Sequence, residues 1–133
     1  MTRRPDTRRR VDSGVAWEER YGYCRALRVG DRILVSGTTA TGPGGEVVAP
    51  GDPAGQTRFV LEKIASALDA LGASLGDVVR TRVYVRDHGV WEAVAAVHGE
   101  VFAAIRPANT LVRAEPIGDG YLVEIEAEAV ILP

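Results

Sequence analysis

The chain has 133 residues, of which 46% are hydrophobic and 26% charged, and its formal net charge is −2 at pH 7. This balance is typical of a soluble domain, and no apolar run approaches the ~20 residues that a membrane helix needs. The single cysteine, Cys24, excludes an intramolecular disulfide. We therefore expect one soluble, cytoplasmic domain without a membrane partner.

The positive charge is concentrated at the N-terminus. Five arginines lie within the first ten residues, opposed only by Asp6, and the rest of the chain carries a net charge of −6. A protein that binds nucleic acid normally carries its basic residues on the folded body, so a nucleic-acid partner is not expected. We interpret residues 1–15 as a basic, flexible tail and residues 16–133 as a single domain.

The first predicted elements are two strands joined by a tight turn, over residues 24–29 and 33–35. Glycines and prolines then place residues 38–51 in a loop. Asp52-Pro53 predicts the start of a helix, because an N-cap residue is followed by proline at the first helical position. Gly72 ends this helix. The spacing of three and four predicts one apolar face, formed by Val60, Leu61, Ile64, Leu68 and Leu71.

The second half of the chain predicts three more strands and one more helix. Residues 78–86 alternate as a strand, and a helix runs from His88 or Gly89 to Ile105, before Pro107. Strands follow over 110–114 and 121–131. This order predicts an α+β fold, a two-layer sandwich with a mixed sheet and two helices packed on one face. In the strand over residues 78–86, the residues expected to be buried are Val79, Thr81, Val83 and Val85.

Three carboxylates share the polar face of the last predicted strand, at Glu124, Glu126 and Glu128. One of them, placed in a cleft, could act as a general acid or base, but the spacing does not select which. A partner subunit that covers this face would have to pair these charges, so an oligomer is plausible. His88 and His98 do not have the spacing of metal ligands, and we expect no metal and no cofactor.

A set of short motifs runs through the chain between about residues 23 and 131. In order they are Ser36-Gly37, the helix beginning near Gln56, Gly76-Asp77-Val78-Val79 with Val83-Tyr84-Val85, Pro107-Ala108-Asn109-Thr110, and Val123-Glu124-Ile125-Glu126-Ala127-Glu128-Ala129. Together they resemble the RidA (YjgF) family. The resemblance implies a chorismate-mutase-like fold and a homotrimer with small-molecule clefts between subunits. It also implies hydrolysis of 2-imino or 2-enamino acids to 2-keto acids and ammonia, without a metal or cofactor.

The resemblance also implies roles for individual residues. Glu124 matches a catalytic glutamate that positions or activates water, and Tyr23 and Ser36-Gly37 match residues that line the substrate cleft. Asn109 stands where the family's arginine grips the substrate carboxylate, and Thr38 stands where many members carry glutamine. An amide provides neither a charge nor a two-pronged guanidinium. Because charged hydrogen bonds are worth ~1.5–3 kcal/mol, the exchange implies a roughly ten- to over a hundredfold lower affinity for a carboxylate.

Asn109 leaves two functions open. One is a hydrolase that adds water to a small imine or enamine, with an altered substrate class. The other is a catalytically silent trimer that binds a small molecule or regulates. Arg25 could supply the missing charge, or strand alternation could point it away. RNA cleavage, an activity also attached to the family, is not favoured because only the tail is basic.

Overall fold

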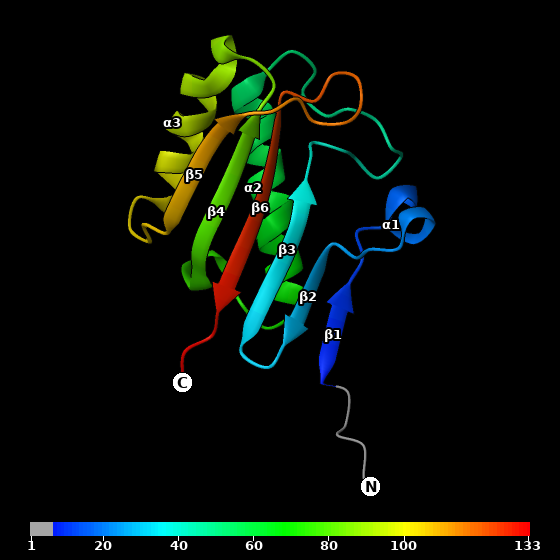
Figure 1. Cartoon of the computed structure of the whole chain (residues 1–133), viewed down its shortest axis with the longest axis vertical. Coiled ribbons are helices and arrows are strands. Elements are labelled where there is room, and N and C mark those ends of the chain that lie inside the picture. The colour runs from blue at the N-terminus through cyan, green and yellow to red at the C-terminus, as the bar shows by residue number, and fades with distance from the viewer. Residues whose placement is uncertain (1–6) are drawn as a thin grey trace, which may run out of the picture.

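Six strands form one mixed sheet in the computed structural model, which describes residues 7–133 (Figure 1). The strand order is β1-β2-β3-β6-β4-β5. Strands β4 and β5 are parallel, and every other neighbouring pair is antiparallel. The strands are β1 (Arg8–Val11), β2 (Ala26–Val29), β3 (Arg32–Thr38), β4 (Val78–Val85), β5 (Ala108–Arg113) and β6 (Val123–Val130).

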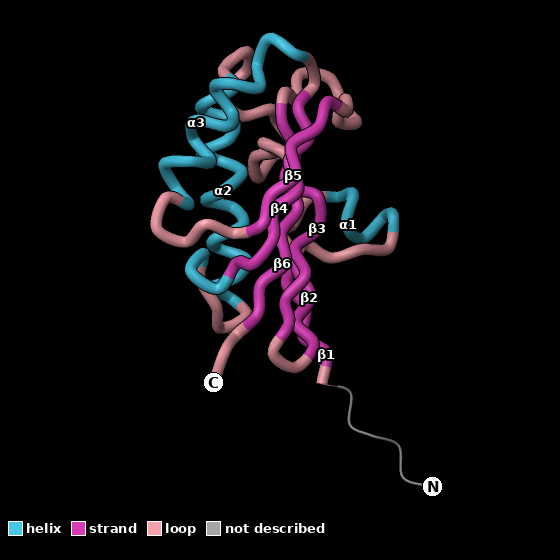
Figure 2. Tube along the Cα trace, turned by 60° about the vertical axis from the view of Figure 1, so that its left-hand side comes forward, coloured by secondary structure: helices cyan, strands magenta, loops and turns pink. Residues whose placement is uncertain are grey.

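Two long helices cover one face of this sheet. Figure 2 shows α2 (Pro53–Ala70) and α3 (Trp91–Phe102) on the same side, and α1 (Ala16–Tyr21) on the opposite side. Short 3₁₀ turns at Leu75–Asp77 and His88–Val90 precede β4 and α3. The predicted two-layer α+β arrangement is confirmed, although α1 was not expected. Within residues 7–133 no helix is long and apolar enough to cross a membrane.

Helix α2 begins as its sequence predicts and ties the core to the loop before β6. The Asp52 side chain accepts a hydrogen bond from the Gly55 amide at 2.9 Å, and Pro53 follows the cap. The fully buried Gln56 donates to the Gly120 carbonyl and accepts from the Leu122 amide, both at 2.9 Å. The predicted apolar face is buried at Val60, Leu61, Ile64, Leu68 and Leu71.

Two irregularities in the sheet shift side chains from their expected positions. The β4–β6 register breaks between Val78 and Arg80, so Val78 takes the core position and Val79, expected inside, is 45% exposed. The β3–β6 register breaks between Val35 and Thr38. Such bulges re-aim side chains and are frequent next to active sites. The second one lies at Ser36-Gly37, a motif singled out in the sequence.

The N-terminal segment forms part of the fold. Residues 8–11 pair antiparallel with β2, and the Arg25 amide donates to the Val11 carbonyl at 2.9 Å. Residues 8–11, which the sequence places in the basic tail, thus form an edge strand, because backbone pairing at a free sheet edge does not need an apolar side-chain pattern, and charged residues suit an edge. Residues 1–6 of the expected tail lie outside the described residues.

Candidate active site

A cleft of about 540 Å³ opens beside the last residues of β3, where β2 no longer covers that strand. This volume is within the range of small-molecule sites. Its lining includes Ala16 and Trp17 from α1, and Ile117 and Tyr121 from the loop before β6. Chemically reactive side chains in the cleft come from four parts of the chain: Tyr23, Arg25, Ser36, Lys63 and Glu124.

Glu124 differs from the two other carboxylates on its strand face. Glu126 accepts a hydrogen bond from the Tyr84 hydroxyl, and Glu128 accepts one from Arg82 at 3.2 Å. Glu124 makes no hydrogen bond or ion pair with the described residues, and it lines the cleft. The structure therefore distinguishes Glu124 from Glu126 and Glu128, which the spacing in the sequence alone could not do.

The protonation of Glu124 is shifted by its surroundings. Burial raises the pKa of its carboxyl group, because a charge is less well solvated there. The positive charge of Arg25 opposes this rise, and the negative charge of Glu126 adds to it. The net direction is upward, toward the range in which a carboxyl group can both accept and release a proton near neutral pH.

Gly37 allows Glu124 to lie directly against the backbone of β3. A β-carbon at Gly37 would overlap the Glu124 carboxylate oxygen and would lie 3.1 Å from its Cδ atom. The neighbouring Ser36 fixes this stretch, since its hydroxyl donates to the Cys24 carbonyl at 2.8 Å and its amide to the Arg25 carbonyl at 2.9 Å. The absence of a side chain at Gly37 is thus part of the cleft's shape.

Arg25 points inward beneath the cleft and is almost fully buried. Its Nε atom lies 2.9 Å from Glu18 Oε2, with side-chain exposures of 5% and 3%. Its Nη1 atom donates to the Gly37 carbonyl at 2.5 Å and to Thr38 Oγ1 at 2.9 Å. Burial alone would raise the pKa of Glu18, but hydrogen bonds from Ser13 and Arg25 outweigh burial and lower the pKa. The direction of Arg25, left open by the sequence, is toward the cleft floor.

The residues singled out in the sequence are not all in the cleft. Tyr23 lines it, with its ring centroid 5.6 Å from the Arg25 guanidinium carbon, as do Ser36-Gly37 and Glu124. Thr38, expected to contact substrate, is instead fully buried and donates to the Ser36 carbonyl at 2.8 Å. Its position at the bulge turns its side chain under the strand, where it holds Arg25.

Asn109 is not brought to the cleft within one chain. It lies exposed on β5 opposite Thr81 of β4, whereas Glu124 lies opposite Tyr84. Because β5 and β6 lie on either side of β4, and the paired positions differ by three residues along β4, the backbones of Asn109 and Glu124 are roughly 14 Å apart. An Asn109 contact with a ligand held by Glu124 therefore needs a second copy of the chain.

Lys63 is a cleft residue that the sequence analysis missed. It extends from α2, and its ammonium donates to the Thr41 carbonyl at 3.1 Å. Burial lowers the pKa of Lys63, the positive charge of Arg25 adds to this, and Glu18 opposes it. The available signal was compositional: Lys63 is the only lysine in a chain that carries 15 arginines.

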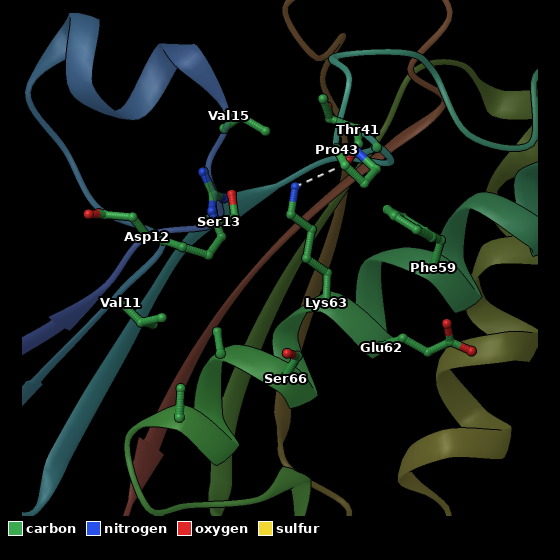
Figure 3. A pocket seen from close by; sticks show the side chains of 14 residues that line it. Val11, Asp12, Ser13, Val15, Thr41, Pro43, Phe59, Glu62, Lys63 and Ser66 are labelled. Atoms are coloured by element: carbon green, nitrogen blue, oxygen red, sulfur yellow. Dashed lines mark hydrogen bonds between the residues drawn. The ribbon is translucent and has the colours of Figure 1, made fainter.

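A second cavity of about 450 Å³ lies on the other side of Lys63, between α2 and the segment after β1. Figure 3 shows Lys63 rising from α2 toward Thr41, with Ser13 and Val15 across from it. The two cavities share Val15, Arg25, Thr41 and Lys63. Within residues 7–133 no three His, Cys, Asp or Glu side chains are placed to hold a metal ion.

Comparison with known proteins matches both the fold and the cleft-forming segments. The profile of the family described as Endoribonuclease L-PSP matches residues 14–131. The crystal structure of Rv2704 from Mycobacterium tuberculosis, a member of the YjgF/YER057c/UK114 family, superimposes with a TM-score of 0.84. It is 44% identical and covers 94% of this chain and 100% of its own. The chain belongs to this YjgF/YER057c/UK114 family.

Two curated relatives extend the comparison. The uncharacterized protein SCO2049 of Streptomyces coelicolor is 38% identical over 122 residues, which are 91% of this chain and 90% of that protein. The 3-aminoacrylate deaminase RutC of Acinetobacter baylyi is 35% identical over 107 residues, which are 80% of this chain and 85% of that protein. The family resemblance in the sequence is confirmed, and one relative bears the name of a deaminase.

Proposed function

We propose that this chain is a hydrolase that releases ammonia from a small imine or enamine by adding water, with Glu124 as its catalytic residue. One observation carries the proposal. Among the described residues Glu124 is the carboxylate on its strand face that has no hydrogen-bond or ion-pair partner, it lines the cleft, and its pKa is raised by burial. The relative named as a 3-aminoacrylate deaminase supports the reaction class.

The chemistry needs one group that moves a proton twice. The ionised Glu124 takes a proton from water as the water oxygen bonds to the imine carbon. It returns that proton to the nitrogen to give a carbinolamine, and then carries the hydroxyl proton of the carbinolamine to the same nitrogen as the C–N bond breaks, which leaves a carbonyl and ammonia. A raised pKa suits both transfers, because it brings the pKa of the carboxyl group closer to neutral pH. The lack of a side chain at Gly37 leaves room for the carboxylate against the backbone of β3.

A homotrimer with the ligand cleft at the subunit interface is part of the proposal. All six residues of β5 are exposed, including the apolar Leu111 and Val112. On the open sheet face, Arg82 already pairs with Glu126 and Glu128, so covering these charges would not leave them unpaired. The Asn109 amide would then act from a neighbouring copy, replacing the arginine that the family resemblance implies. Sedimentation equilibrium tests the trimer, and a monomer at micromolar concentration contradicts it.

The function is tested by ammonia release from freshly generated 2-iminopropanoate. We expect Glu124→Gln to lower kcat by about 100-fold or more, since general acid–base catalysis contributes ~10²–10⁴-fold. Glu128→Gln is the matched control, because Glu128 lies on the same strand face but is paired with Arg82. Release by the wild type no faster than in buffer, or equal rates for wild type and Glu124→Gln, would contradict the proposal.

The second candidate is a trimer that binds a small molecule without turnover, and the neutral amide of Asn109 favours it. A ligand of such a trimer would raise the melting temperature by mass action. Asn109→Arg separates the two functions. If the wild type releases no ammonia but Asn109→Arg does, the cleft is competent for hydrolysis and the native ligand is a different molecule. Raised melting temperatures without ammonia release from any imine would support the binding trimer.

A further inference from the structure

The neutral amide of Asn109 brings no positive charge to the site, but the cleft is lined by the ammonium group of Lys63. We propose that Lys63, supported by Arg25, binds the carboxylate of an anionic substrate, so that the anion is anchored by helix α2 of the same chain that supplies Glu124. This deepens the proposed function, because it assigns an anionic substrate class and the residue that selects it. The inference rests on four observations at the junction of the two cavities.

Lys63 is available to a ligand. Among the described residues no carboxylate lies within ion-pair distance of its ammonium, and its one hydrogen bond goes to the Thr41 carbonyl. An ammonium group has three donors, so two remain. A partly buried ammonium without a counter-ion is costly, and a bound carboxylate would remove that cost.

Arg25 has a different role, because its charge is already paired with Glu18. Its Nε atom donates to Glu18 and its Nη1 atom to the Gly37 carbonyl and Thr38, which uses three of its five N–H donors. It therefore contributes a fixed positive charge near Lys63 and holds the β3 backbone under Glu124. We regard Arg25 as a positioning residue, and Lys63 as the group that touches the anion.

The acidic residues near Lys63 leave the cleft side open to an anion. The cavity on the α2 side is lined by Asp12 and Glu62, and Figure 3 shows both carboxylates directed away from the Lys63 ammonium. On the cleft side the acidic lining residue is Glu124. An anion that meets Lys63 from the cleft side is therefore placed in the same cavity as the proposed proton-transfer group.

The rest of the cleft indicates what else the substrate carries. Val15, Ala16, Trp17 and Ile117 provide the apolar part of its lining. A carboxylate at Lys63 and a reacting carbon at Glu124 would leave an apolar side chain to pack against Trp17. The geometry thus fits a small carboxylate with an apolar substituent.

A kinetic test compares an anionic and a neutral imine of similar size, 2-iminopropanoate and butan-2-imine. We expect Lys63→Met to raise KM for 2-iminopropanoate by about 10- to 100-fold, the value of a charged hydrogen bond, and to leave butan-2-imine unaffected. Arg58→Met is the matched control, since it removes one positive charge from an exposed position on the same helix. Equal effects of Lys63→Met on both imines would overturn the inference.

A binding test does not depend on turnover. Lysine labelled with ¹⁵N at its ε position marks only the Lys63 ammonium, because the chain has a single lysine, and it leaves all three N–H donors in place. Loss of the signal in Lys63→Met identifies it. We expect pyruvate, but not butanone, to shift that signal saturably. An unmoved Lys63 signal overturns the anchor, whereas absent ammonia release alone overturns only the proposed function.

Discussion

The buried ion pair beneath the cleft makes a quantitative prediction about stability. Glu18→Gln preserves volume and one acceptor oxygen but leaves the Arg25 charge uncompensated at about 5% exposure. Removing one partner of a buried pair costs ~3–5 kcal/mol, and because the remaining amide oxygen can still accept, we expect the lower end, about 3 kcal/mol. Urea unfolding at pH 7 and fixed protein concentration measures this loss.

The chain offers a matched control for this experiment. Arg58 and Glu100 have the same 2.9 Å nitrogen–oxygen separation, but their side chains are 52% and 60% exposed. Glu100→Gln should therefore leave the free energy of unfolding unchanged within error, because solvent screens an exposed pair. If Glu18→Gln and Glu100→Gln cost the same, burial does not set the strength of the pair and the reasoning is refuted.

The same pair predicts a pH dependence. The folded-state pKa of Glu18 is lowered from 4.5, so its contribution is complete above the unfolded-state pKa and is lost as the pH falls through the lower folded-state value. The difference in unfolding free energy between wild type and Glu18→Gln should therefore be constant at neutral pH. It should shrink below pH 4.5, and a difference that grows on acidification contradicts this sign.

Three further predictions concern the cleft. The kcat of ammonia release should rise with pH through the raised pKa of Glu124, with a midpoint above 4.5 set by burial, Arg25 and Glu126, and Glu124→Gln should lose this limb. Gly37→Ala should lower kcat by about tenfold or more, because its methyl group displaces the Glu124 carboxylate, while circular dichroism shows a folded protein. Thr38→Val should destabilise the chain by ~1 kcal/mol in urea unfolding, because it removes two buried hydrogen bonds without changing volume much; an unchanged midpoint would contradict this.

The elements that the sequence predicts correctly are those with strong local signals. Helix α2 has an N-cap, a proline at its first position and a continuous apolar face, and β6 alternates along its full length. Strand β1 and helix α1 lack such signals. The three arginines of β1 show no apolar–polar alternation, so this strand forms only because the edge of β2 is free to pair with it. Helix α1 has six residues, too few for a local pattern to indicate a helix.

The site was predictable only where a family motif or a backbone requirement identified it. Tyr23, Ser36-Gly37 and Glu124 lie together because the motifs that carry the resemblance share one cleft. Spacing could not single out Glu124, since the side chains that bond Glu126 and Glu128 come from another strand, β4. Lys63 was missed because Thr41 and Arg25, which define its surroundings, belong to segments outside α2.

The segment that forms part of the cleft lining bears on how the substrate selection of such a protein can be altered. Val15, Ala16 and Trp17 line the cleft, but the segment is attached through the β1 edge pairing and the Glu18–Arg25 contact. The largest fully buried side chains of the core come from β3, β4, β6 and the long helices instead. Exchange of Val15, Ala16 and Trp17 with Glu18 retained would therefore reshape ligand entry while the proton-transfer floor stays intact, which separates the selection of a substrate from its chemistry.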